Sequence, residues 1–539
     1  MMKHHRWLLI AAAALGSCGG VATGAPPGSQ SDDWSAYNRT LAGDRYSPLA
    51  EITTANVGQL TLRCAFTLPE VVSFQTGPLV VGGTMYFTSF EASYAIDAAT
   101  CVQKWSRHDK TPGPPGLAVN RGFAYLDGRL FRGTADAHVI ALDAADGHPL
   151  WEHPLAVGGP GISVPMAPIA ANGRVYVGNA GGDTVGVTGH VYALDARDGH
   201  LIWRFDVVPA KGRARSTWTN SRLPVSGGAF WTSFTLDEAK GILYVPAGNP
   251  APDFDRLDRT GENLYADSVI ALDAASGRIL GYNQLVKRDS HDWDVDSAPT
   301  LATTRNGRSI IASANKDGLL SILDRSKLDG SAAAAADAAP VIPLLSQTAT
   351  TTRENVEAPL SREHPVHFCP GMGGGTEWNG AAFSPRTDSL FVGAVDLCAH
   401  VQLVRELKVP APGEVWFGSS GSMAEMVEPA DTARGWLTAF DAENGRVRWK
   451  FKAPHPIVAG VTPTGGDLVF AADLGGDVFA FDQTQGRVLW QINTGQSIGG
   501  GLVVYRAGGH ELLGVAAGMK SFAWPGSADK SRILIYGLR

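Results

Sequence analysis

The chain has 539 residues, a formal net charge of −7 at pH 7 and a pI near 6.1. This acidic balance argues against nucleic acid as the partner, because such a partner calls for clustered Lys and Arg. A hydrophobic content of 44% together with 64 glycines is typical of an all-β protein with many turns.

The first 25 residues have the pattern of a secretory signal peptide. The basic start MMKHHRW precedes the apolar core LLIAAAALG, which is too short to span a bilayer, and small residues follow. Residues 15–18, Leu-Gly-Ser-Cys, resemble a bacterial lipobox, in which Cys18 is acylated after cleavage. The alternative is ordinary secretion with cleavage near Ala25. Both interpretations predict export to a bacterial periplasm, and the first adds a lipid anchor.

One phrase then recurs along the chain: apolar residues, Asp, a few small residues, Gly and Trp. Self-similarity at a period of roughly 40–50 residues predicts a propeller or a solenoid. The copies with Trp are YAIDAATCVQKW (94–105), IALDAADGHPLW (140–151), YALDARDGHLIW (192–203), TAFDAENGRVRW (438–449) and FAFDQTQGRVLW (479–490); IALDAASGRILGY from 270 and SILDRSKLDG from 321 lack it.

Each copy predicts a buried strand, an Asp-Gly turn and a return strand that ends in Trp. A further strand signal precedes most copies, as in NGRVYVGNA, so each unit offers the four antiparallel strands of a propeller blade. Seven copies and a last unit at 512–518, closed by RILIYGL, predict a single eight-bladed β-propeller over residues 30–539. The segment DWSAYNRTLAGDRYSPL near the N-terminus is expected to add to the closure. The repeat Trp residues are predicted to pack between neighbouring blades.

Besides Cys18 the chain has four cysteines, Cys64, Cys101, Cys369 and Cys398. An even number in an oxidising compartment indicates two disulfides. Of the three pairings, we favour Cys64–Cys101 and Cys369–Cys398, which join near neighbours in the sequence. The sequence has no Cys-x-x-Cys-His motif for haem attachment and no zinc-binding spacing.

Four segments depart from the repeat, and we expect function there, around the mouth of the propeller channel. They are VGNAGGDTVGVTGHVYALD with Asp183, SGGAFWTSFTLD with Trp231, YVPAGNPAPDFD with Asn249, and RDSHDWDVDSAPTL with His291, Asp292, Asp294 and Asp296 around Trp293. An acidic loop with an Asn elsewhere offers oxygen ligands that suit Ca²⁺ or another hard cation. The plain alternative is that these are turn residues in solvated loops.

Together these segments resemble the pyrroloquinoline quinone (PQQ) dependent alcohol dehydrogenases, the eight-bladed quinoproteins, specifically those without a fused haem domain. The phrases that carry the resemblance are, in order, RYSPLAEITTANVGQL (45–60), TGPLVVGGTMYFTS, VNRGFAY, GNPAP, HDWDVD, NKDGLLSILDR and GDLVFAADLGGDVFAFD. The chain departs from many relatives because PPGLAVNRG has no adjacent Cys-Cys pair. Propellers such as outer-membrane assembly factors share the repeat but are not expected to carry these loops.

By position, the resemblance implies a metal site formed by Asp183, Asn249 and Asp294, with Asp183 standing where the family usually has Glu. Asp294 resembles the catalytic base of the family's His-Asp-x-Trp-Asp motif. The motif is one residue shorter here, which leaves Asp292 as the alternative base. Asp296 resembles the extra metal-binding carboxylate of lanthanide-using relatives, although some Ca²⁺ or Mg²⁺ quinoproteins also have Asp there.

The resemblance also implies a set of contacts to PQQ, namely Gln75 (or its neighbour Thr76), Arg121, Trp231, Lys316 and Trp378. Lys316 resembles the catalytic cation that bonds the reactive quinone oxygens. Trp231 resembles the indole that stacks on the quinone plane, since a flat aromatic face suits a flat cofactor. Arg121 resembles a bidentate contact to the cofactor's carboxylates.

The implied function is oxidation of a small-molecule or polymeric alcohol to an aldehyde or ketone, by hydride transfer to PQQ. A bound Ca²⁺, or alternatively a lanthanide, would act as Lewis acid. The electrons would pass to an external cytochrome c or another acceptor. The alternatives are a quinoprotein that oxidises sugars or aldehydes, and a non-catalytic propeller that serves as a scaffold.

Overall fold

The computed structural model describes residues 1–2, 32–109, 117–155, 161–219, 223–328, 339–520, 524 and 526–539. It divides the chain into two units, Met1–Ser31 and Asp32–Arg539. The predicted lipobox with Cys18, and all of the predicted signal peptide except its first two residues, lie outside the described residues. Among the residues described, no helix combines the length and the apolar character needed to cross a membrane.

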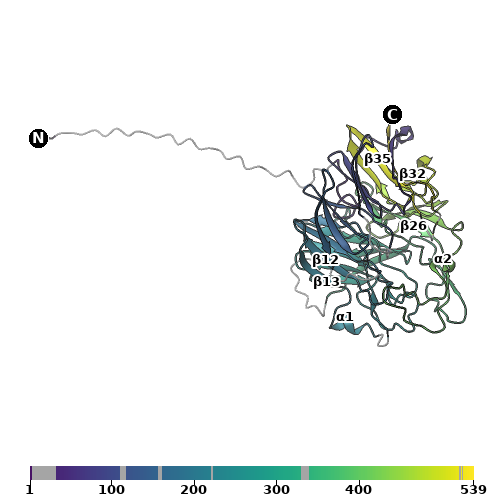
Figure 1. Cartoon of the computed structure of the whole chain (residues 1–539). Helices are drawn as coiled ribbons and strands as arrows, with labels where there is room; N and C mark the ends of the chain where they lie inside the picture. Colours follow the sequence, from purple (N-terminus) through teal and green to yellow (C-terminus); the bar gives the residue numbers. More distant parts are fainter. Residues whose placement is uncertain are drawn as a thin grey trace. The chain divides into compact units, whose positions relative to one another are not determined.

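In the described part of Asp32–Arg539, the repeated phrases fold into eight four-stranded antiparallel sheets, the eight blades of a β-propeller (Figure 1). The first four blades contain β2 (Leu79–Val81), β3 (Thr84–Thr88), β4 (Ala92–Asp97) and β5 (Gln103–His108); β6 (Ala124–Leu126), β7 (Arg129–Gly133), β8 (His138–Asp143) and β9 (Pro149–Pro154); β10 (Ile169–Ala171), β11 (Arg174–Gly178), β12 (His190–Asp195) and β13 (Leu201–Asp206); and β15 (Thr235–Asp237), β16 (Ile242–Ala247), β18 (Ser268–Asp273) and β19 (Ile279–Gln284). The predicted fold class and blade number are confirmed.

The remaining blades follow the same order of strands except at the point of closure. They contain β20 (Thr300–Thr303), β21 (Ser309–Ala314), β22 (Leu319–Asp324) and β23 (Leu344–Ala349); β25 (Ala381–Ser384), β26 (Ser389–Asp396), β28 (Arg434–Asp441) and β29 (Val447–Ala453); β30 (Thr462–Pro463), β31 (Leu468–Ala472), β32 (Asp477–Asp482) and β33 (Val488–Asn493); and β34 (Leu502–Ala507), β35 (His510–Ala517), β36 (Arg532–Leu538) and β1 (Leu60–Thr67).

The eighth blade joins the two ends of Asp32–Arg539, because β1 pairs antiparallel with β36. In Figure 1 the purple N-terminal strands accordingly lie beside the yellow C-terminal ones. The strand that completes this blade is β1, which pairs with the predicted closing strand β36. The N-terminal segment expected to add to the closure, residues 33–49, forms isolated bridges, Trp34 with Val80 of the first blade and Ser47 with Thr464 beside the seventh.

Among the described residues, two small sheets and three short helices accompany the blades. They are β14 (Ser226–Gly227) with β17 (Pro250–Ala251), β24 (Val366–Phe368) with β27 (Ala399–Val401), the 3₁₀-helix η1 (Val57–Gln59), α1 (Arg213–Ser216) and α2 (Met423–Met426). Both favoured disulfides are confirmed. Cys64–Cys101 ties the closing strand β1 to the first blade, and Cys369–Cys398 joins the ends of β24 and β27.

The repeat Trp residues hold one blade to the next, as predicted. Four of the five indole N–H groups donate to a main-chain carbonyl in the Asp-Gly turn of the following blade: Trp105 to Ala144 (3.1 Å), Trp151 to Ala196 (3.2 Å), Trp203 to Ala274 (3.2 Å) and Trp449 to Gln483 (2.9 Å). Because every buried indole N–H needs an acceptor, this bond fixes the indole in the space between the two sheets.

The glycines of the turns that meet an indole, Gly147, Gly199, Gly277 and Gly486, are required for their positive φ and for the close approach of the ring. Gly199 has a φ of +76°, and a Cβ added to it would lie 2.6 Å from the Trp151 ring. In the first blade, Cys101 stands at the turn position with a φ of +61° and makes the disulfide to Cys64. The turn chemistry therefore serves blade packing as well as the local change of direction.

We expect Gly199→Ala to destabilise the protein more than Gly173→Ala. Both glycines have similar positive φ, +76° and +73°, but nothing lies within 4 Å of a Cβ at Gly173. The shared backbone strain costs about 1–2 kcal/mol, and the clash with Trp151 should add about 1–3 kcal/mol in Gly199→Ala alone. Thermal unfolding of the two variants measures the difference. Equal midpoints would contradict the role given to the indole contact.

Candidate cofactor and metal centre

Lys316 and two aspartates form a buried charged group at the centre of the predicted site. Lys316 lies in the turn between β21 and β22, and the aspartates lie in the loop between β19 and β20. The Lys316 Nζ is 3.1 Å from Asp292 Oδ1 and 3.0 Å from Asp294 Oδ2, and all three side chains are buried. Asp292 has a φ of +60°, a conformation that Asp tolerates better than most residues. The structure thus brings the predicted catalytic pair together.

The carboxylates around Lys316 keep its side chain protonated. Burial on its own would lower the pKa of Lys316, but the negative charges of Asp292 and Asp294, followed by Glu377 and Asp296, raise that pKa well above its usual value. In contrast, burial raises the pKa of Asp292, and the charge of Lys316 opposes that rise. Lys316 is therefore a permanent ammonium at this site.

The three residues of the predicted metal site also meet, although they come from three different loops. The main-chain N–H of Asn249 donates to Asp294 Oδ1 at 2.9 Å. The neighbouring Gly248 is required, because a Cβ there would lie 2.4 Å from the same oxygen. Burial, followed by the charge of Asp294, raises the pKa of Asp183 to about 6. Asp183, Asn249 and Asp294 can therefore act on one ion.

Asp253 is a member of this acidic group that the sequence analysis missed. It is fully buried, and neither of its carboxylate oxygens has a hydrogen-bond partner among the described residues. Burial, followed by the charges of Asp183 and Asp292, raises its pKa well above the usual value. Its only sequence signal is its place four residues after Asn249.

This donor set fits a hard cation. The carboxylates of Asp183, Asp253, Asp292 and Asp294 face the ammonium of Lys316, and the buried guanidinium of Arg259 acts on Asp253 alone among them. The offered ligands are oxygen atoms in a site shielded from water. Such oxygen-rich, negatively charged sites suit Ca²⁺ or an ion of similar chemistry. Without a cation, the carboxylates can lower their mutual repulsion only by taking up protons.

Asp296 lies with Glu377 next to Lys316. Both oxygens of Asp296 lack a hydrogen-bond partner among the described residues, and burial, followed by Glu377 and Asp294, raises its pKa well above the usual value. Burial raises the pKa of Glu377 to about 7, with Lys316 opposing. Glu377 is the second site residue that the sequence analysis missed, and it directly precedes Trp378.

Arg121 lies between two indoles, and this is where the predicted cofactor contacts gather. Its Cζ is 4.9 Å from the Trp231 ring centroid and 5.0 Å from that of Trp378. Its Nη2 donates to Gln75 Oε1 at 2.7 Å and its Nη1 donates to the Trp231 carbonyl at 2.7 Å. The Nε atom has no partner among the described residues. Of the two neighbours predicted as alternatives, Gln75 is the one bonded to Arg121, whereas the Thr76 hydroxyl lies 3.4 Å from that of Thr88.

This part of the site offers flat apolar faces together with a cation. Burial lowers the pKa of Arg121 to about 10, so its guanidinium stays charged at neutral pH. Cations over indole faces are stabilised by the ring electrons, and the free Nε can still bind an anionic group. Planar rings that carry carboxylates fit these residues.

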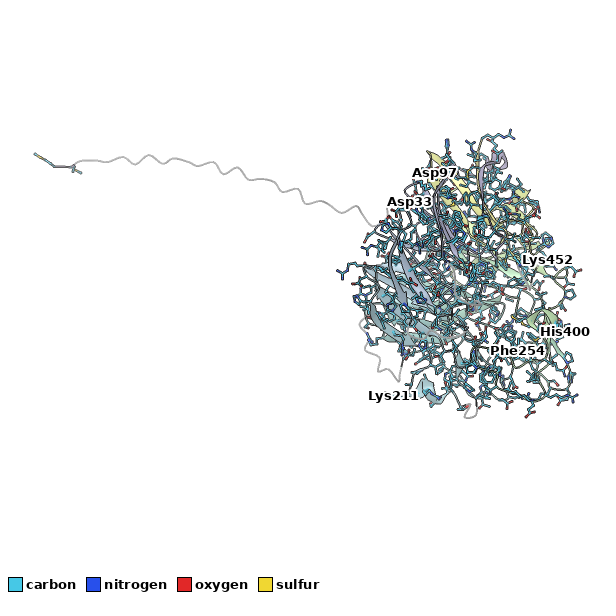
Figure 2. The ribbon with its side chains drawn as sticks, viewed as in Figure 1. Asp33, Asp97, Lys211, Phe254, His400 and Lys452 are labelled. Atoms are coloured by element: carbon cyan, nitrogen blue, oxygen red, sulfur yellow. A yellow bond between two sulfur atoms is a disulfide. The ribbon has the colours of Figure 1, made fainter. Side chains whose placement is uncertain are left out.

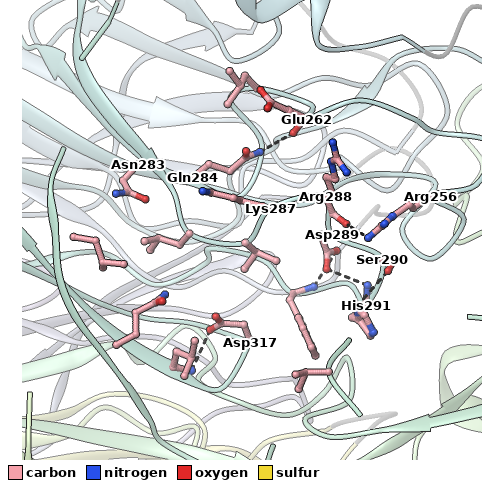
Figure 3. Close-up of a pocket in the computed structure, with 18 of the residues that line it drawn as sticks. Arg256, Glu262, Asn283, Gln284, Lys287, Arg288, Asp289, Ser290, His291 and Asp317 are labelled. Atoms are coloured by element: carbon pink, nitrogen blue, oxygen red, sulfur yellow. Dashed lines mark hydrogen bonds between the residues drawn. The ribbon is translucent and has the colours of Figure 1, made fainter. Parts of the chain in front are cut away.

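A separate cavity of about 970 Å³ is lined by the first part of the acidic loop (Figure 3). His291, Asp289 and Asp317 line it, but Asp294, Asn249 and Trp231 do not. His291 stacks on Trp293 with ring centroids 4.2 Å apart, and burial lowers its pKa to about 4. His291 is therefore neutral at physiological pH, and it braces Trp293 from the side of the cavity.

Comparison with known proteins identifies the family of this chain. A family model described as glucose/ethanol/alcohol dehydrogenase, beta-propeller domain, matches residues 34–341, more than half of the chain. The chain belongs to this family. A second model, described as outer membrane protein assembly factor BamB, matches residues 433–525.

Relatives resemble this dehydrogenase-family propeller over most of its length. A quinohemoprotein alcohol dehydrogenase of Pseudomonas putida is 28% identical over 543 residues, covering 94% of this chain and 77% of the relative. A lanthanide-dependent methanol dehydrogenase of Methylacidiphilum fumariolicum is 28% identical over 513 residues, covering 88% of this chain and 82% of the relative.

Solved structures show the same fold. The quinohemoprotein alcohol dehydrogenase from Comamonas testosteroni superimposes with a TM-score of 0.82 at 24% identity, covering 94% of this chain and 81% of that one. A europium-containing methanol dehydrogenase gives a TM-score of 0.81 at 23% identity, covering 94% and 98%.

In this family member, the matched residues 34–341 contain Asp183, Asn249, Asp294 and Lys316. Glu377 and Trp378 lie beyond that range but belong to the same buried centre. The carboxylate of Glu377 interacts with the charges of Lys316 and Arg121, and Arg121 lies over the Trp378 ring. The sixth blade thus completes a site that the dehydrogenase model covers only in part.

We expect Lys316→Met to destabilise the cation-free protein by about 3–5 kcal/mol, because it leaves Asp292 and Asp294 buried without their ammonium. The exposed Lys408→Met, which removes the same charge at the surface, is the matched control. Thermal unfolding in the presence of a chelator measures both. Equal thermal midpoints for Lys316→Met and Lys408→Met would show that the buried ion pairs do not stabilise the protein.

Proposed function

We propose that this family member is a periplasmic quinoprotein dehydrogenase that oxidises an alcohol to an aldehyde or ketone by hydride transfer to PQQ. Ca²⁺ serves as its Lewis acid, and an external cytochrome c or another acceptor takes up the electrons. The observation that carries the proposal is the buried Lys316–Asp294 pair, which adjoins both the oxygen-donor cluster and, through Glu377, the Arg121 site. The dehydrogenase family and the alcohol-oxidising relatives support this reaction class.

Asp183, Asn249 and Asp294 are the residues that hold the cation in this proposal, with Asp253 as a further buried carboxylate beside them. Trp231 stacks on the cofactor ring, and Arg121 binds its carboxylates with donors that include the unpaired Nε. When bound, PQQ supplies the hydride acceptor, and the cation supplies Lewis-acid polarisation of its carbonyl.

Asp294 acts as general base in this proposal. It takes the proton of the alcohol hydroxyl on a carboxylate oxygen while the hydride leaves the alcohol carbon. The Asn249 N–H at Oδ1 and the Lys316 ammonium at Oδ2 fix the orientation of the carboxylate. Asp292 also contacts Lys316, but the Asn249 N–H donates to Asp294, which favours Asp294 as the base.

The role of Asp294 as general base can be tested by substitution. We expect Asp294→Asn to lower PQQ-dependent dye reduction by about 10²–10⁴-fold, the usual contribution of a general base. The amide keeps the size of the side chain, so PQQ should still bind, which the absorbance of the protein-bound quinone reports. The exposed Asp198→Asn is the control and should keep full activity. Retained turnover in Asp294→Asn would overturn the assignment.

The metal and the substrate can be tested by reconstitution of the cofactor-free protein. We expect cofactor-free protein to become active with PQQ and Ca²⁺, assayed by dye reduction with primary, secondary and polymeric alcohols and with sugars. Activity with a light lanthanide alone would instead assign the unpaired oxygens of Asp296 to the metal. Activity restricted to sugars would replace the alcohol in the proposal. Failure to bind PQQ with either ion would leave the scaffold alternative.

A further inference from the structure

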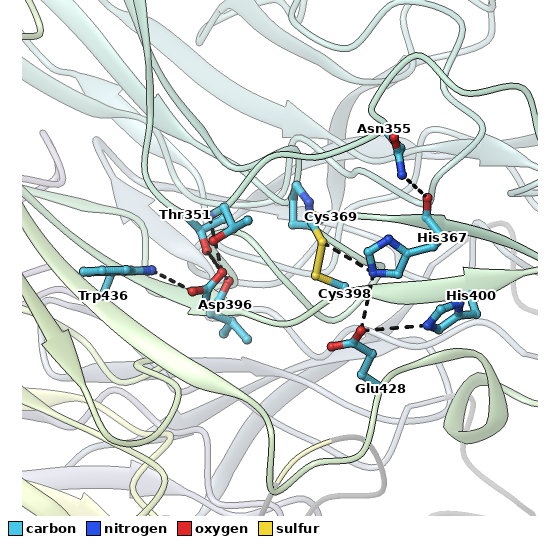
Figure 4. The surroundings of a disulfide bond; sticks show 12 residues. Thr351, Asn355, His367, Cys369, Asp396, Cys398, His400, Glu428 and Trp436 are labelled. Atoms are coloured by element: carbon cyan, nitrogen blue, oxygen red, sulfur yellow. Dashed lines mark hydrogen bonds and ion pairs between the residues drawn. A yellow bond between two sulfur atoms is a disulfide. The ribbon is translucent and has the colours of Figure 1, made fainter.

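A second group of metal-binding side chains lies outside the central site, on the insertion that carries the Cys369–Cys398 disulfide (Figure 4). His367 on β24 and His400 on β27 are directly opposite each other in this two-stranded antiparallel sheet. Glu428 comes from the segment after α2, and its main-chain N–H donates to the Cys398 carbonyl at 3.1 Å. Three separate segments therefore bring these side chains to one place.

We propose that His367, His400 and Glu428 form a binding site for a divalent first-row transition metal such as Zn²⁺. The Glu428 Oε1 is 3.4 Å from His367 Nε2 and 3.8 Å from His400 Nε2. One ligand atom from each residue lies within 4.8 Å of the other two. In a tetrahedral zinc site with bonds of about 2.0–2.1 Å, ligand atoms are about 3.3 Å apart. Small side-chain rotations bring the three atoms to that spacing.

The chemistry of these ligands differs from that of the centre. Two imidazoles and one carboxylate are a set that Zn²⁺ and similar ions use, and they leave a fourth position for water. Ca²⁺ prefers sites built from oxygen atoms alone, such as the one around Asp294. The two sites of this chain therefore select different ions.

The site is open to solvent and yet held in place. The side chains of His367, His400 and Glu428 are 32%, 51% and 30% exposed, so a metal ion can reach them. Figure 2 shows His400 at the outer edge of the described propeller. The Asn355 amide donates to the His367 carbonyl at 3.0 Å, which fixes that main chain.

The neighbouring disulfide holds the site without providing ligands. Cys369 Sγ is 3.8 Å from His367 Nε2, but its sulfur is bonded to Cys398 and is therefore not a thiolate. The imidazoles and the carboxylate thus supply the binding, and the disulfide fixes the distance between β24 and β27.

Metal binding here would also hold the strand that packs on the acidic loop. Phe368, next to His367, contacts the His291 ring with centroids 4.5 Å apart. The Pro370 carbonyl accepts a hydrogen bond from the Trp293 indole at 3.0 Å. A metal that links β24, β27 and Glu428 should therefore stabilise the folded protein, by an amount that rises with the logarithm of the metal concentration above Kd.

The test is a calorimetric titration of Zn²⁺ into the intact protein in excess Ca²⁺, without reductant and with thiol titration to verify the disulfides. We expect one equivalent to bind. His400→Ala and Glu428→Gln should each weaken binding by about tenfold or more, the loss of one of three ligands. Zn²⁺ should raise the thermal midpoint of the wild type but not that of His400→Ala.

His364→Ala is the matched control, because His364 is exposed on the same segment and contacts Ser361 rather than Glu428. It should bind Zn²⁺ as the wild type does. Absence of Zn²⁺ binding to the wild type in excess Ca²⁺ would overturn the proposal. Zn²⁺ affinities of His400→Ala and Glu428→Gln equal to that of the wild type would also overturn it. The result does not depend on PQQ or on turnover, so it stands apart from the proposed dehydrogenase activity.

Discussion

The site exists only because the ring of blades closes. Indole N–H bonds such as that of Trp151 to Ala196 join neighbouring blades at four of the contacts between described blades, and the β1–β36 pairing with the Cys64–Cys101 disulfide joins the last blade to the first. Asp183, Asn249, Asp294, Lys316 and Glu377 come from loops spread over the third to the sixth blade. Each loop would face solvent in an open chain, and closure turns them all toward one buried centre.

The fold could be predicted where its information is local. The Asp-Gly-Trp phrase contains a strand, a turn and the contact to the next blade within about a dozen residues, so it identifies blades without any knowledge of their partners. The closing strand β1 has no such phrase, because its partner β36 lies more than 450 residues further along the chain. Pairing at that distance leaves no periodic signal, so the sequence pointed to residues 33–49 as an addition to the closure and did not point to β1.

The residues of the site also divide into those that a local phrase identifies and those that depend on distant parts of the chain. Asp294, Asn249 and Lys316 stand in recognisable phrases, and the structure brings them together. Asp253 and Glu377 were missed because their importance lies in burial and in unpaired oxygens, which depend on several loops at once. A single carboxylate in a loop is most often a solvated turn residue, and only packing shows that these two are not.

Burial of so many carboxylates makes the centre dependent on a positive charge other than Lys316. Unfolded, these carboxyl groups ionise near pH 4, whereas the native pKa is about 6 for Asp183 and about 7 for Glu377. Because the folded state holds these protons more tightly, the cation-free protein loses stability as the pH rises from about 4 through 7. A bound hard cation would offset this loss by stabilising the ionised forms. Metal binding at the acidic centre would therefore be coupled to folding at neutral pH, whereas the proposed imidazole-containing site at His367 and His400 does not share that constraint because it is exposed.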